Sequence, residues 1–189
     1  MPTTLGGVQV LFDGVAAALL YVTPSQLSAV VPQGVSRRPA TTLEVTNGAG
    51  KSDPMVLPVA ASAPGIFTMD GTTQAIAVNE DGSMNSAANP AATGSAIMVF
   101  VSGAGRTEPP EMDGLIVADE QIRPRLPVRA TIGEAAAEVL SAASASGTAS
   151  DVIRVQVRIP KGVAPSAAAP VRIVVGGSGS QAGVTIAIR

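Results

Sequence analysis

The sequence contains no histidine and no cysteine. A Ser-His-Asp triad, a Cys-His pair, a histidine-based zinc site and a thiolate-bound iron–sulfur cluster are therefore impossible within this chain. Tryptophan is absent as well, and the aromatic side chains are Phe12, Tyr21, Phe67 and Phe100. Sugar-stacking platforms and base-stacking sheets need several aromatic faces, so both kinds of site are disfavoured.

A basic surplus and long apolar runs are also missing. Twelve Lys and Arg residues oppose fourteen Asp and Glu residues, which gives a formal net charge of −2. Because there is no positive surplus to neutralise phosphates, we expect no nucleic-acid partner. The longest apolar stretch, residues 15–31, is interrupted by Pro24 and polar neighbours, so the sequence predicts no membrane span. Residues 1–7 lack the charged and apolar regions of a signal peptide, and none is expected on this chain.

What is present indicates strands. Twenty glycines and fifteen prolines punctuate the chain, and the short runs between them are rich in valine and isoleucine, which favour strands over helices. Residues 155–159 alternate apolar and polar side chains, the pattern of a half-buried antiparallel strand. Only the alanine-rich residues 134–149 carry a helix signal, which Gly133 and Gly147 weaken. Many short strands with frequent turn signals predict an all-β fold of the β-sandwich type.

An internal repeat organises the chain. Residues 27–35 match residues 155–163, with the proline, glycine and valine after the strand in register. The same offset of 128 residues continues through the hairpin that follows, and upstream an offset of 120 relates residues 8–20 to 128–140. The extra residues of the second copy lie in a small-residue loop at 141–151. Two copies of one strand–hairpin–strand unit therefore build the chain, and we expect a tandem pair of domains.

The two copies are unequal. The second copy begins with a further strand at residues 95–101, which has no counterpart ahead of the first copy. We therefore expect a first domain over residues 1–66 that lacks its opening strand, a connector with a hairpin over residues 67–93, and a second domain over residues 94–189. An unpaired strand edge is a template for another chain. Two outcomes are open: the connector folds back to fill the gap, or two chains pair there as a homodimer.

Short motifs along nearly the whole chain resemble one bacterial family. They are LGGVQV at residues 5–10, LLYVTPSQL at 19–27, APGIF at 63–67, DGSMNS at 81–86 with NPA at 89–91, and GVTIAIR at 183–189. On these motifs the chain resembles the Solibacter uncharacterised C-terminal domain family. The resemblance implies tandem immunoglobulin-like sandwiches of the IPT/TIG type, at the end of large secreted or cell-surface bacterial proteins. It implies no catalytic residues, and family members usually carry a further strand segment ahead of the first motif, which is absent here.

An acidic loop is the first candidate site. Its carboxylates are Glu108, Glu111, Asp113, Asp119 and Glu120. Hard oxygen ligands suit Ca²⁺ and Mg²⁺, so any ion bound here is predicted to be calcium rather than zinc. Because histidine is absent, these carboxylates are also the groups available to activate water, and Glu111 and Asp113 are the catalytic candidates. The competing interpretation is a charged loop that keeps the protein soluble and pairs with neighbouring arginines.

A polar turn is the second candidate site. Oxygen-bearing side chains fall at every second residue, and this spacing resembles the start of a calcium-binding loop. The bidentate glutamate of an EF-hand would fall at Pro90, so that pattern fails. The competing interpretation is a solvated hairpin turn, since Asp-Gly within a polar cluster is a strong turn signal. The candidate ligands are Asn79, Asp81, Ser83 and Asn85.

Two functional hypotheses follow. The first is a non-catalytic spacer, adhesion or binding module outside the cell or at its surface, because the chain lacks nucleophile–base machinery. The alternative is a calcium-dependent hydrolase of small esters or lactones, such as N-acyl-homoserine lactones, in which loop carboxylates hold the ion and activate water. Only the second hypothesis requires a cofactor, which is Ca²⁺.

Overall fold

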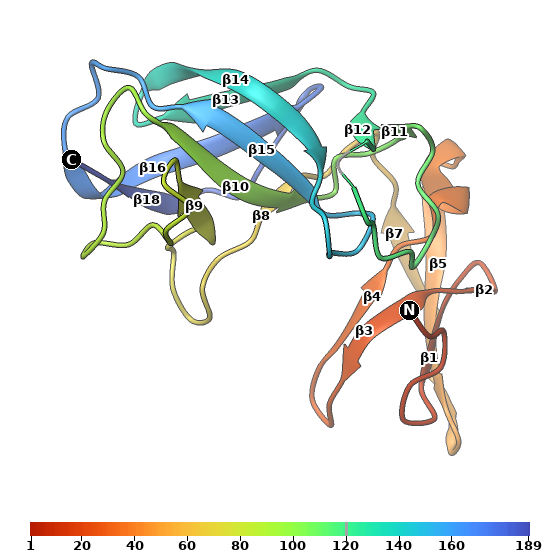
Figure 1. Cartoon of the computed structure of the whole chain (residues 1–189). Helices are drawn as coiled ribbons and strands as arrows, with labels where there is room; N and C mark the ends of the chain where they lie inside the picture. The colour runs from red at the N-terminus through yellow and green to blue at the C-terminus, as the bar shows by residue number, and fades with distance from the viewer. Residues whose placement is uncertain (120) are drawn as a thin grey trace.

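The computed structural model describes residues 1–119 and 121–189. Throughout these residues the protein consists of β-strands, turns and one 3₁₀-helix, η1 (Gln33–Arg37), with no α-helix. The predicted all-β fold is thus confirmed. No helix in the described part of the chain has the length and apolar character needed to cross a membrane. The strands form a smaller N-terminal lobe and a larger C-terminal lobe (Figure 1).

The N-terminal lobe spans residues 1–58. Its strands are β1 (Gln9–Phe12), β2 (Val15–Ala16), β3 (Ala18–Val22), β4 (Leu27–Val30), β5 (Ala40–Asn47), β6 (Gly50–Lys51) and β7 (Met55–Pro58). An antiparallel sheet has the order β2-β1-β5-β6 with β7 also paired to β5, and β3 and β4 form a separate ribbon. In β1 the side chains of Val10 and Phe12 are buried and their neighbours are partly exposed, because one face of the strand is covered.

The C-terminal lobe spans residues 65–189. Its strands are β8 (Gly65–Ile66), β9 (Ala77–Asn79), β10 (Ala96–Ser102), β11 (Thr107–Glu108), β12 (Arg123–Pro124), β13 (Val128–Ile132), β14 (Ala135–Ser144), β15 (Ile153–Arg158), β16 (Ser166–Val175), β17 (Ser178–Gly179) and β18 (Thr185–Ile188). One sheet has the order β17-β16-β13-β14-β15-β10-β8, with β9 added at β10 and β18 at β16. The sheet curls strongly, because the first residues of β14 pair with β13 and its later residues pair with β15.

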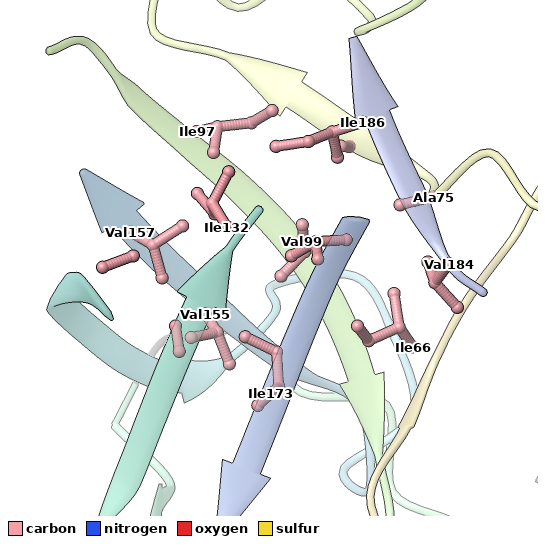
Figure 2. Close-up of a cluster of buried hydrophobic side chains, with 14 of the residues drawn as sticks. Ile66, Ala75, Ile97, Val99, Ile132, Val155, Val157, Ile173, Val184 and Ile186 are labelled. Atoms are coloured by element: carbon pink, nitrogen blue, oxygen red, sulfur yellow. The ribbon is translucent and has the colours of Figure 1, made fainter. Parts of the chain in front are cut away.

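The main hydrophobic core lies inside the curled sheet. Side chains from β10, β13, β15, β16 and β18 meet there, and Ile66 and Ala75 close one side of the core beside Val184 (Figure 2). Every second side chain of β15 is buried, so the alternation in the sequence is confirmed as a strand with one covered face. The N-terminal lobe has a much smaller buried cluster, which consists of Val10, Phe12, Ala17, Leu19 and Val35.

The repeat predicted from the sequence is confirmed by the strand pairing. Val10 lies opposite Val45 in the β1–β5 pair, and Ala130, at the matching position, lies opposite Ile173 in the β13–β16 pair. The β3–β4 and β14–β15 pairs also contain a register shift at the same relative position. The two copies therefore pair their strands in the same register, not only in the same order.

Two matched serines make matched hydrogen bonds. The hydroxyl of Ser52 accepts the N–H of Val45 at 3.0 Å, and the hydroxyl of Ser180 accepts the N–H of Ile173 at 3.1 Å. In each copy the serine N–H donates back to the carbonyl of the same partner. The serine thus completes the backbone pairing where the short strand after the turn ends.

Residues 67–93, which the sequence sets apart as a connector, pack on the C-terminal lobe. Here β9 pairs with β10, and the N–H groups of Ala75 and Ala91 donate to the carbonyls of Thr185 (2.8 Å) and Ala187 (3.0 Å). β18 is therefore hydrogen-bonded on both edges, by β16 and by the connector. The connector therefore covers strand edges of the second copy. It does not take the place of the opening strand that the first copy lacks.

Candidate binding cleft

A cleft of about 860 Å³ lies between the two lobes. Its N-terminal wall is formed by the end of β4, the start of η1 and the end of β7, and its C-terminal wall by the segment after β10 and the start of β15. The largest apolar side chains that line it are Phe12, Leu57, Leu126 and Ile153, and Val30 and Val35 lie beside them. The charged side chains that line it are Arg106, Glu111, Arg125 and Asp151.

The segment that joins the lobes is fastened to the C-terminal wall. The N–H of Ala63 donates to the carbonyl of Gly103 (2.9 Å), and the buried hydroxyl of Ser62 donates to the carbonyl of Val175 (2.8 Å). Gly103 has a φ of 68°, and a Cβ at this position would collide with the carbonyl of Ala63. Only glycine allows the two backbones to approach this closely.

The acidic loop after β11 forms a second bridge between the lobes. One carboxylate oxygen of Asp113 accepts the N–H of Gln33 at 2.9 Å, and the side-chain amide of Gln33 donates to Glu111. The N-terminal ammonium of Met1 donates to the carbonyl of Gly114 at 2.6 Å. In Figure 1 this loop, in green, reaches from the C-terminal lobe to the smaller lobe. Two independent bridges therefore hold the walls of the cleft in place.

Glu111 and Asp151 are brought together by their supporting loops. The buried hydroxyl of Thr107 accepts the N–H of Glu111 at 3.0 Å, which fixes the loop at the cleft. On the facing segment the hydroxyl of Ser150 donates to the carbonyl of Met112 at 2.9 Å. The residue after Ser150 is Asp151, whose charge acts on Glu111.

Burial and like charge raise the pKa of Glu111 from its ordinary value of 4.5 to about 7. Loss of hydration is the largest cause, the charge of Asp151 adds to it, the hydrogen bond from Gln33 opposes it, and the charge of Asp113 contributes least. Burial also raises the pKa of Asp151. One oxygen of Asp151 is buried and accepts no hydrogen bond from the described residues. This pair of carboxyl groups therefore retains protons at a higher pH than exposed carboxyl groups do.

The sequence identified Glu111 as a candidate but missed Asp151. No local spacing relates the two residues, because they come from segments far apart in the chain. The signal lies in the strand pairing: Val101 of β10 is opposite Ile153 of β15. The loop after β10 and the residues just before β15 therefore lie at the same end of the sheet.

The other carboxylates of the acidic loop do not all join this pair. Glu108 is exposed, with its Oε2 3.8 Å from Nε of Arg125. Asp119 is also exposed, and Glu120 lies outside the described residues. Within the described ranges no three acidic side chains gather closely enough to hold a metal ion. Calcium binding by this loop stays a prediction.

The polar turn after β9 is engaged in hydrogen bonds of its own. The buried Asn85 accepts the N–H of Ala187 (2.8 Å) and donates to the carbonyl of Ala187 (2.8 Å) and to Oδ1 of Asn79 (2.9 Å). A carboxylate oxygen of Asp81 accepts the N–H of Ser83 at 2.9 Å, and the hydrogen bonds from Ser83 lower the pKa of Asp81. Asn85 thus attaches the turn to β18, while Asn79, Asp81 and Ser83 are hydrogen-bonded within the turn. The sequence did not predict this role.

Comparison with known proteins gives one distant similarity. No family model matches the sequence, and no curated protein matches it at a significant level. Among solved structures, the Bacteroides ovatus mixed-linkage glucan utilization locus protein SGBP-B, in complex with a mixed-linkage heptasaccharide, is similar at a TM-score of 0.31 and 12% sequence identity. The similarity covers 96% of this chain and 37% of that chain, so this chain spans little more than a third of that protein. At this level the similarity carries no information about a site.

Proposed function

We propose that the chain is a non-catalytic binding module of a secreted or cell-surface bacterial protein, with the cleft between its lobes as the ligand site. The observation that carries the proposal is the cleft of about 860 Å³. Its walls are mainly apolar with a few charged groups, which is the general form of a ligand site. Two independent bridges hold the walls in place, so a ligand would enter a preformed space at little ordering cost.

The architecture supports the same proposal. Each lobe contains one copy of the repeated strand unit, and the motifs resemble a family of tandem sandwiches. We therefore propose that each lobe is an immunoglobulin-like sandwich of the IPT/TIG type, the first without its opening strand. The location outside the cell or at its surface is part of the proposal, because it rests on that resemblance. A chain without histidine or cysteine suits binding better than nucleophile–base catalysis.

A ligand screen with a blocked cleft tests this function. The isotope-labelled chain is exposed to panels of short peptides and soluble oligosaccharides, and NMR records which backbone amide signals shift. Ala61 lines the cleft and is exposed, so Ala61→Trp places an indole in it. Ala49→Trp adds the same group at an exposed turn of the N-terminal lobe and is the matched control.

We expect ligands that shift signals of Gly103 and Gly105, bind Ala49→Trp normally and lose affinity for Ala61→Trp. A panel in which no compound shifts these signals would show that the cleft is not a binding site. Ligands that bind both variants equally would place the site elsewhere.

The raised pKa of Glu111 beside Asp151 favours a second candidate function, hydrolysis of a small ester or lactone. A carboxylate with a pKa of about 7 is suited to accept a proton from water and return it to the departing alcohol. Water would add to the ester carbonyl, and the products would be a carboxylic acid and an alcohol. In the calcium-dependent version of this hypothesis, a bound Ca²⁺ would polarise the carbonyl.

Turnover assays separate the two functions. N-acyl-homoserine lactones and nitrophenyl esters are incubated with the chain in calcium and in chelator, and with Glu111→Gln and Asp151→Asn. Hydrolysis lost in both variants would establish the enzyme, and its dependence on chelator would decide the role of calcium. Rates equal to buffer with every substrate would rule the hydrolase out for these compounds and support the binding module.

A further inference from the structure

The outer edge of β4 is open. The N–H and C=O groups of successive residues in an antiparallel strand point to opposite edges. The carbonyl of Gln26 accepts the N–H of Thr23 at 2.7 Å. The backbone N–H and C=O groups of Gln26, Ser28 and Val30 therefore point toward β3. Leu27, Ala29 and Val31 face the other way, where no backbone hydrogen bond to any described residue is found.

The second copy shows what covers the same edge. β15 is the counterpart of β4, and its matching edge is paired with β10. Ile97 of β10 lies opposite Val157, and the N–H of Ile159 donates to the carbonyl of Ser95 at 2.9 Å. In the second copy, therefore, an added antiparallel strand, β10, covers the edge that stays open in the first copy.

The exposure of matched side chains shows what the first copy lacks. Val31 follows β4 and is 48% exposed, whereas its counterpart Ile159 is 0% exposed. Ala29 is partly exposed, whereas Val157 is fully buried. Ala29 and Val31 also line the cleft. The open edge and an apolar part of the cleft wall are thus the same surface.

We propose that the outer edge of β4 binds an extended polypeptide segment of a partner protein, which adds to the ribbon as an antiparallel strand and occupies the cleft. The inference rests on the proposed function, because it names the ligand of the same cleft. The register follows from β10: apolar side chains at every second position would lie opposite Leu27 and Ala29, as Ile97 lies opposite Val157. Recognition of this kind takes affinity from the main chain and specificity from alternate side chains.

The charges at one end of the edge define the partner further. An antiparallel segment would have its N-terminal end toward Gln33, the residue that is bound to Asp113 and Glu111. Asp151 adds a third carboxyl group near this place. A lysine or arginine two or three residues ahead of the added strand would compensate this charge. The partner segment is therefore an apolar strand with a cationic residue before it.

A second copy of this chain fits the edge less well. If two β4 strands paired, residues 24–26 of the second chain would approach Gln33, and none of them is charged. The chain's own N-terminal segment is engaged on the opposite edge of the ribbon, where the N–H of Leu19 donates to the carbonyl of Pro2 at 2.8 Å. Charge complementarity therefore favours a segment of another protein.

A synthetic peptide tests strand addition directly. It carries the sequence of Ser95–Ser102 preceded by two lysines, and its binding to the intact chain is followed by fluorescence anisotropy. Methylation of the backbone nitrogen at the Ile97 position removes the N–H that would face β4, and we expect it to weaken binding about tenfold. Methylation at the Met98 position changes an N–H that faces away, so this matched control should change affinity less than about twofold.

A second comparison tests the charge. At pH 8, where Glu111 is mostly ionised, Glu111→Gln should weaken binding of the lysine peptide about threefold. It should leave a peptide with glycines in place of the lysines unaffected. The substitution removes the charge and keeps the shape of the side chain, so a general loss of folding would appear with both peptides and the charge effect with only one.

Several outcomes would overturn the inference. They are equal effects of the two methylations, equal affinity for a scrambled peptide, and a homodimer in light scattering that the peptide does not dissociate. If the peptide does not bind while another ligand still distinguishes Ala61→Trp from Ala49→Trp, strand addition is wrong and the proposed function stands. If no ligand of any class makes that distinction, the proposed function is wrong as well.

Discussion

The two copies of the repeat pair their strands alike and differ in what covers them. Val56 in the first copy is 69% exposed, and its counterpart Val184 in the second is 3% exposed. The difference comes from elements outside the repeat, since Ile66 and Ala75 pack beside Val184 (Figure 2). Strand pairing is thus a property of the repeated unit, whereas a full hydrophobic core depends on β8, β9, β10 and the connector.

Hydrogen exchange at matched amides should show the largest difference between the copies. The N–H of Ser52 donates to the carbonyl of Val45 at 2.8 Å, and the N–H of Ser180 to that of Ile173 at 2.7 Å. Because the N-terminal lobe has the smaller core, we expect the Ser180 amide to be protected about 100-fold more, which corresponds to about 2.7 kcal/mol. Native-state exchange followed by NMR measures this, and equal protection would mean that the added elements do not stabilise their lobe selectively.

The buried polar turn of the C-terminal lobe should be the next most sensitive. Asn85→Ala removes four hydrogen bonds, including one from the side-chain amide of Gln74, and leaves the N–H and carbonyl of Ala187 without these partners. We expect the free energy of unfolding to fall by about 2 to 3 kcal/mol. Asn47→Ala, in an exposed turn of the N-terminal lobe, is the control, with a loss below about 1 kcal/mol. Urea unfolding gives both values, and a similar loss in both variants would contradict the role assigned to Asn85.

Truncation of the matched valines Val184 and Val56 tests directly how much the elements outside the repeat contribute to the stability of the second copy. Val184→Ala removes two buried methyl groups and should cost about 2 kcal/mol. Val56→Ala should cost less than about 0.5 kcal/mol, because the side chain is mostly exposed. Both variants are compared by urea unfolding monitored in the lobe that carries the change. A large effect at Val56 would show that another molecule covers it under the conditions of the measurement.

The smallest effect is expected at the acid pair, and it depends on pH. The pKa of Glu111 is raised in the folded protein, so between pH 4.5 and 7 the folded state binds more protons than the unfolded state. Stability should therefore fall as the pH rises through this window. Glu111→Gln should match the parent at pH 4 and exceed it by about 1 kcal/mol at pH 8, a value reduced for the partial exposure of the group.

The control for this prediction is Asp119→Asn, on the exposed part of the same loop. Its unfolding free energy should follow that of the parent at pH 4, 6 and 8. If Glu111→Gln also follows the parent at every pH, the carboxyl group of Glu111 is better hydrated in solution than its place in the cleft indicates.

Local patterns predicted the strands and the repeat well. The offsets of 128 and 120 residues between the copies match the observed register, since Val10 and Val45 pair as Ala130 and Ile173 do. Strand alternation and turn residues are local properties, so they can be read from one sequence. The same holds for the excess of glycine and proline that excluded a helical fold.

What escaped prediction depends on contacts between distant segments. The alanine-rich stretch at residues 134–149 carried a weak helix signal, but most of it forms β14, because strands on both sides supply its hydrogen bonds. The connector joins β10 and β18 by tertiary packing that no local pattern records. Asp151 reaches Glu111 for the same reason. Of the candidate site, the sequence therefore revealed one carboxylate of the pair and neither the cleft nor its apolar walls.

The position of β18 between two hydrogen-bonded neighbours has a mechanical consequence. A pull along this strand loads its bonds to β16 and to the connector in shear, so they must break together rather than one after another. The small N-terminal lobe has no comparable clamp around β4. Under tension the N-terminal lobe should therefore unfold first, while β18 stays paired with β16 and the connector.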